Sequence, residues 1–107
     1  MTDPRTDLNA FAEWTEAFWN ATPAPIEIRD IAIMGLGLAG ESGETVEHLK
    51  KHIRNGKIDV DKLKLELGDV LYYWARICRA YGLTPTEVMA ANIEKLTARR
   101  AAKEKAA

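Results

Sequence analysis

At 107 residues, with 47% hydrophobic and 29% charged side chains, the chain has the size and composition of one globular domain. Its formal net charge of −1 provides no general attraction to nucleic acid or to an anionic membrane. The single cysteine, Cys78, excludes an internal disulfide and a zinc site built from several cysteines.

The first ten residues, MTDPRTDLNA, lack the basic and then apolar pattern of a signal peptide. No apolar run approaches the length of a membrane span. We therefore expect a single domain over residues 1–107 in a reduced, cytoplasmic and soluble protein. A chain of this length forms only a modest core, so oligomerisation is a reasonable expectation.

A first helix is expected from Asp7 to Asn20, where apolar and aromatic residues recur at helical spacing. Trp14 and Trp19 both fall within it. Packing or a dimer contact is the commoner use of such residues, and an aromatic wall against a nucleobase is the alternative. The sequence TPAP at 22–25 ends this helix, because proline fixes its own backbone and disfavours helix at the residue before it.

A second helix is expected to begin between Ile26 and Asp30, to run to Ile53, and to end at Asn55-Gly56, a common left-handed stop. Four glycines interrupt it, although each costs about 0.5–1 kcal/mol relative to alanine in a helix interior. Their number indicates a close approach to the backbone, either by a neighbouring helix or by a ligand. The glycines are Gly35, Gly37, Gly40 and Gly43.

A third helix follows, with Asp59 as its N-cap and Gly82 at its end. One apolar stripe runs along it at steps of three and four residues. The stripe consists of Leu63, Leu67, Val70, Trp74, Ile77 and Tyr81. Cys78 is expected to be a small core residue.

The fourth helix has a capping box at its start, Thr84-Pro85-Thr86-Glu87, with proline at the first helical position. Its core stripe is expected to be Met89, Ile93 and Leu96. An adjacent face carries Asn92 and Lys95. These side chains could contact phosphate or could simply be exposed to solvent, and the pattern alone favours solvent exposure. No strand-like alternation appears, so the fold class expected is all-α.

Two acidic pairs carry the candidate chemistry: Glu41 with Glu44, and Glu66 with Asp69, each with its two members on one helix face. Consecutive helices joined by a short loop pack antiparallel, which would bring the four carboxylates together. Such a cluster would repel itself unless a cation lay within it, and oxygen ligands select hard ions such as magnesium, manganese or calcium. A di-iron centre needs Glu-x-x-His, and neither histidine has a glutamate three residues before it.

We therefore expect a magnesium site that hydrolyses a phosphate compound. Lys50, Lys51 and Lys95 would add positive charge at the leaving pyrophosphate. His48 and His52 are expected to be surface residues.

Three blocks, LGLAGESGETVEHLKKHI, KLKLELGDVLYYWARI and GLTPTEVMAANIEKLTAR, resemble the MazG-like nucleotide pyrophosphohydrolases of the all-α NTP pyrophosphatase superfamily. The resemblance spans roughly residues 31–99, inside a motif-bearing core of about 26–99. It implies a four-helix MazG-like bundle whose core is completed by homo-oligomerisation, as a homodimer or a dimer of dimers.

The family pattern is Glu-Glu-x-x-Glu followed by Glu-x-x-Asp. The resemblance implies that the four carboxylates are catalytic Mg²⁺ ligands, with Mn²⁺ as a substitute, in the hydrolysis of a nucleoside triphosphate to monophosphate and pyrophosphate. Its substrates would be nucleotides such as dNTPs or modified NTPs. Gly40 stands where the family has the leading glutamate, which bears on how many metals are held.

The resemblance also implies that Asn92 and Lys95 contact nucleotide or phosphate, which overrides the solvated interpretation above. Tyr73 and an N-terminal tryptophan, with Trp19 taken as the candidate, would belong to the nucleoside pocket.

Two other functions remain open at this point. One is a phosphoribosyl-ATP pyrophosphatase, a related all-α enzyme that cleaves the same kind of bond. The other is a helical dimerisation or regulatory module without activity. DNA binding is disfavoured, because no helix carries a basic stripe with base-reading residues.

Overall fold

The computed structural model describes residues 2–19 and 26–106, and over these residues the chain is helical with no strand. The four helices are α1 (Leu8–Trp19), α2 (Ile28–Asn55), α3 (Val60–Ala80) and α4 (Pro85–Ala106). The all-α prediction is confirmed, and the helix bounds match the expected ones closely. The expected end of the first helix at Asn20 and the proline break at 22–25 lie outside the described residues. None of the described helices is long and apolar enough to cross a membrane.

Local capping signals set the ends of the two long central helices. Gly56 closes α2 in the left-handed conformation, with φ 72°, and its N–H donates to the carbonyl of His52 at 2.8 Å. The Asp59 side chain accepts from the backbone N–H of Lys62 at 3.1 Å and so caps α3, as predicted.

The capping box of α4 is also present. The Glu87 N–H donates to Thr84 Oγ1 at 3.2 Å, and the Thr84 N–H donates to Glu87 Oε1 at 2.8 Å. Gly82, with φ 67°, makes the turn between α3 and α4. The local sequence therefore determines where α4 begins.

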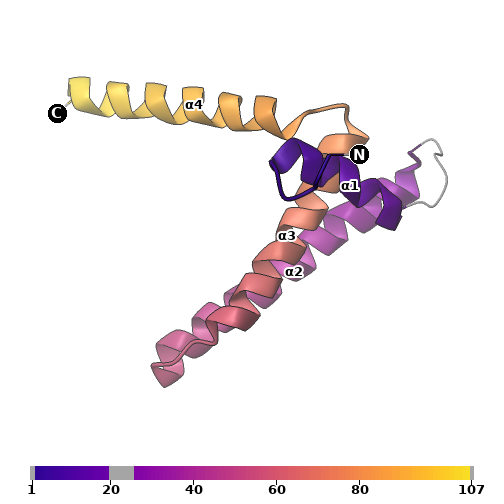
Figure 1. The fold of residues 1–107 in the computed structure, drawn as a ribbon. Coiled ribbons are helices and arrows are strands. Elements are labelled where there is room, and N and C mark those ends of the chain that lie inside the picture. Colours follow the sequence, from indigo (N-terminus) through magenta and orange to yellow (C-terminus); the bar gives the residue numbers. More distant parts are fainter. Residues whose placement is uncertain (1, 20–25, 107) are drawn as a thin grey trace.

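Helices α2 and α3 form a long antiparallel pair, and α1 crosses the end of that pair where α2 begins and α3 ends (Figure 1). The small core lies at this junction. Its buried members are Ala10, Ala12 and Thr15 of α1, Met34 of α2, and Ala75, Arg76 and Cys78 of α3. The prediction that Cys78 is a core residue is confirmed.

Helix α4 projects away from the α2–α3 pair (Figure 1). It is attached near its start to α1, where Asn9 Nδ2 donates to Thr86 Oγ1 at 2.6 Å and the Thr86 N–H donates to Asn9 Oδ1 at 3.0 Å. The prediction that the apolar stripe of α4 belongs to the core is wrong for the single chain. Its residues are largely exposed, at 46% for Met89, 63% for Ile93 and 47% for Leu96. The helix leaves the core after the Gly82 turn, so within residues 2–19 and 26–106 no other element buries this stripe.

The chain is expanded for its length. Its radius of gyration is 17.0 Å, against about 13 Å for a compact domain of this size. Its accessible surface is 8184 Å², roughly 2,200 Å² more than a compact monomer of this mass exposes. A large apolar surface is therefore left open along α2, α3 and α4.

Candidate metal and active site

The antiparallel α2–α3 pair brings residues from both acidic pairs together. One carboxylate oxygen each from Glu41, Glu66 and Asp69 lies within 4.8 Å of the others. Residues three apart share a helix face, so an acidic pair on each of two facing helices meets its counterpart. The sequence spacing predicted that four carboxylates would meet here, and the structure brings three of them together.

Two of these carboxylates have buried oxygens without a partner. Oε2 of Glu41 and Oε2 of Glu66 are both shielded from water, and neither accepts a hydrogen bond. A buried polar atom left unpaired is costly, and a charged one more so. A cation between the helices would satisfy both oxygens at once.

The crowding of acids also changes their proton affinity. Burial, together with the charge of Glu44, raises the pKa of Glu41 to about 7. Hydrogen bonding to Glu66 raises the pKa of Glu44 above the usual glutamate value. Without a cation, the cluster therefore retains protons near neutral pH that a divalent ion would displace.

Glu44 occupies a different place from the other three acids. It is exposed, and the set of oxygens that converge within 4.8 Å does not include it. It nevertheless lies near enough to Glu66 for their side chains to share a proton. Three of the four expected ligands therefore converge, and the fourth stands at the solvent side.

Tyr73 lies one helical turn from Asp69 on α3 and is half-buried. Its ring packs against the backbone of α2 at Gly37, where an added Cβ would overlap the ring. A neighbouring helix thus explains Gly37. A Cβ at Gly35, Gly40 or Gly43 would meet nothing within 4 Å, so packing within the chain does not account for these three.

Trp19 joins α1 to α2 and α3. Its Nε1 donates to Asp30 Oδ1 at 3.2 Å, and the guanidinium of Arg76 lies 5.8 Å from the centre of its ring. Arg76 is almost fully buried and donates to the hydroxyl of Thr15 at 3.2 Å. Trp19 is half-buried, which leaves part of its ring open.

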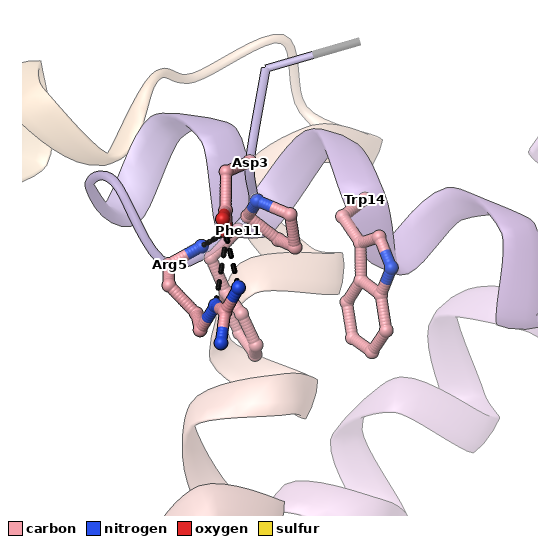
Figure 2. Close-up of a pocket in the computed structure, with 5 residues that line it drawn as sticks. Asp3, Arg5, Phe11 and Trp14 are labelled. Atoms are coloured by element: carbon pink, nitrogen blue, oxygen red, sulfur yellow. Dashed lines mark hydrogen bonds and ion pairs between the residues drawn. The ribbon is translucent and has the colours of Figure 1, made fainter.

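Trp14 faces a different part of the molecule. With Phe11 and Pro4 it lines an open pocket of about 670 Å³ between the N-terminal segment and α1 (Figure 2). Asp3 and Arg5 pair at 2.9 Å on the rim of this pocket. None of the four carboxylates lines this pocket.

The remaining expected substrate contacts are all exposed. Lys50 pairs with Glu47 on its own helix at 3.4 Å, and Lys51 makes no ion pair with a described residue. Asn92 and Lys95 lie on the projecting α4. The fold of one chain does not bring these four side chains to the carboxylates.

The surface prediction is wrong for His48. Its side chain is only 19% exposed, and its Nε2 lies 3.7 Å from Glu66 Oε1. His52 is exposed, as expected. The missed signal was helical spacing, because His48 follows Glu41 by seven residues and Glu44 by four and so continues their face of α2.

The donor set fits a hard divalent cation. The three converging groups offer oxygen atoms alone, as Mg²⁺, Mn²⁺ and Ca²⁺ prefer, and Glu41 and Glu66 each have a buried oxygen without a partner. In the described part of the chain, no lysine or arginine nitrogen lies within 4 Å of any of the four acids to neutralise them.

The chain is similar to proteins of a known family. The family model described as "MazG nucleotide pyrophosphohydrolase domain" matches residues 30–102, most of the chain. The Gene 37 protein of Mycobacterium phage L5 is 33% identical over 78 residues, an alignment that covers 68% of this chain and 68% of that protein. No solved structure matches. The family predicted from the three sequence blocks is thus confirmed: the chain belongs to the MazG nucleotide pyrophosphohydrolases.

Proposed function

We propose that this protein hydrolyses a nucleoside triphosphate to the monophosphate and pyrophosphate with Mg²⁺, for which Mn²⁺ substitutes. The observation that carries the proposal is the convergence of Glu41, Glu66 and Asp69 with two buried, unpaired carboxylate oxygens. Membership of the family supports the proposal that the bond cleaved is the one that releases pyrophosphate. Deoxynucleotides and nucleotides with modified bases are included among the candidate substrates.

In this proposal, Glu41, Glu66 and Asp69 hold the metal between α2 and α3. When bound, the ion neutralises the polyphosphate and lowers the pKa of a water molecule. Glu44 lies at the solvent side of the cluster and outside the set of converging oxygens, so its carboxylate can face an attacking water. We therefore assign Glu44 as the acceptor of the proton that the attacking water loses.

The nucleoside would extend from the acids toward the start of α2. Tyr73 is about 6 Å along α3 from Asp69, which suits a wall beside the sugar or base. Trp19 lies at the start of α2, where its Nε1 donates to Asp30, and keeps part of its ring open. We propose both as nucleoside contacts.

A second copy of this chain would complete the molecule. The surface excess of roughly 2,200 Å² for each chain would give an interface within the range of obligate dimers. An apolar groove of about 320 Å³ lies on this open surface; it is lined by Leu8, Leu38, Leu67, Val70, Leu71, Trp74 and Met89. We propose a homodimer, or a dimer of dimers, that covers this groove and the stripe of α4.

The dimer would also give a role to the exposed polar residues of α4. Within one chain, Asn92 and Lys95 lie on α4, the helix that projects away from the α2–α3 pair. In the dimer we place them at the polyphosphate held by the other subunit. Lys50 and Lys51 are proposed as further phosphate contacts.

The test is pyrophosphate release from a panel of NTPs and dNTPs in Mg²⁺, with phosphoribosyl-ATP as a separate substrate. Glu66→Gln and Asp69→Asn should each abolish release. Asp61→Asn is the matched control, because Asp61 lies on α3 with a side chain that is 92% exposed. Activity on phosphoribosyl-ATP alone would favour the sister enzyme. No release from any substrate would refute the enzymatic proposal and favour the regulatory module.

A further inference from the structure

His48 is the basic side chain that reaches the acidic cluster within the described part of the chain. Its Nε2 lies 3.7 Å from Glu66 Oε1, an ion-pair distance just outside hydrogen-bond range. Both side chains are largely removed from water, at 19% and 21% exposure. A histidine held against a carboxylate in this way is not a free surface residue.

The two oxygens of Glu66 have different surroundings. Oε1 faces His48, whereas Oε2 is buried and has no hydrogen-bond partner. A carboxylate is planar, so a contact that holds one oxygen also limits where the other points. One oxygen of Glu66 lies within 4.8 Å of an oxygen of Glu41 and an oxygen of Asp69, and Oε2 is the oxygen that does not face His48.

We infer that His48 is a positioning residue that holds Glu66 in the orientation in which Oε2 receives the divalent cation. The inference rests on the proposed function for the cation itself. Partners outside the ligand set that orient a ligating group commonly change metal affinity by 10–100-fold. His48 would be such a partner for Glu66. It lies on α2, one turn beyond Glu44, and Glu66 lies on α3.

Two other roles for His48 fit the geometry less well. A direct metal ligand would share the converging space, but that space is defined by three carboxylates and His48 lies on the Oε1 side of Glu66. If His48 only fills space, any side chain of similar volume could replace it, with or without a hydrogen-bond donor. The two roles are separable, because glutamine and methionine have similar shapes and only glutamine offers an N–H.

The experiment is calorimetric titration of the full chain with Mn²⁺ and with Mg²⁺, without nucleotide. We compare the unsubstituted protein with His48→Gln, His48→Met, Glu66→Gln and His52→Ala. We expect His48→Met to weaken binding about tenfold, and His48→Gln to remain within about threefold of the unsubstituted protein. His52→Ala should bind normally, because His52 is exposed one turn further along α2.

Melting temperatures in chelator accompany each titration. Equal weakening by His48→Met and His48→Gln, or normal binding by His48→Met, would overturn the positioning role. If Glu66→Gln loses binding while His48→Met does not, the inference fails and the proposed metal site stands. If the unsubstituted protein binds neither metal, the proposed function falls and the inference falls with it.

Discussion

The ring of Tyr73 occupies the space that a side chain at position 37 would fill, so Gly37 allows α3 to pack closely on α2 beside the acids. Gly37→Ala should force the ring or the helix to move. We expect a loss of about 1–3 kcal/mol in the free energy of unfolding, as for other overpacked positions. Urea denaturation measures this loss.

Gly35→Ala is the matched control for that substitution. A Cβ at position 35 meets nothing within 4 Å, so alanine should stabilise α2 by about 0.5–1 kcal/mol through its higher helix propensity. A similar stability change for the two alanine variants would contradict the close contact at Gly37.

The stability of the metal-free protein should depend on the protonation of Glu41. Burial raises the pKa of this group to about 7 in the folded chain from an ordinary value of 4.5. The folded state therefore binds the proton more tightly than the unfolded state. Its contribution to stability is fully present below about pH 4.5 and is lost as the pH rises through about 7.

Melting temperatures in chelator between pH 5 and pH 8 should therefore fall with increasing pH. Glu41→Gln should reduce this fall, because glutamine does not titrate. An identical pH dependence in Glu41→Gln would show that other groups cause it. In Mg²⁺ the melting temperature should fall less with increasing pH, because metal binding becomes tighter as Glu41 loses its proton.

Divalent metal should raise the stability of the folded chain by mass action. At a hundredfold excess of Mg²⁺ over its dissociation constant, the expected gain is about 2.7 kcal/mol. Asp69→Asn should remove most of this gain, and Asp61→Asn should retain it. Thermal melts in Mg²⁺ and in chelator measure both, and a gain that persists in Asp69→Asn would place the metal elsewhere.

Sequence reasoning predicted the elements and the cluster because both depend on local signals. The caps at Asp59 and Thr84 and the left-handed stop at Gly56 act over a few residues, and the structure contains all three. Glu41, Glu66 and Asp69 converge because a spacing of three residues and a short loop determine which faces of α2 and α3 meet, whereas Glu44 lies outside that set. No tertiary information is needed for either result.

The direction of α4 and the role of His48 could not be predicted in the same way. A stripe of Met89, Ile93 and Leu96 shows that one face of the helix is apolar, but not whether its own chain or another copy covers it. His48 was predicted to be a surface residue because histidines are commonly exposed. Its actual surroundings depend on the register between α2 and α3. Contacts of this kind depend on how whole elements meet.

The exposed stripe of α4 leads to a prediction about assembly. Ile93 is 63% exposed in the single chain, so Ile93→Glu should leave the fold of that chain intact and disfavour a dimer that buries the stripe. Ala98→Glu adds the same charge on the opposite face of α4 and should not affect assembly. Light scattering should give a multiple of 11.9 kDa for the unsubstituted protein and for Ala98→Glu, and a mass near 11.9 kDa for Ile93→Glu. A mass of 11.9 kDa for the unsubstituted protein would show that the stripe is not an interface between copies. Asn92 and Lys95 could then not contact a polyphosphate held by the acids of a second subunit.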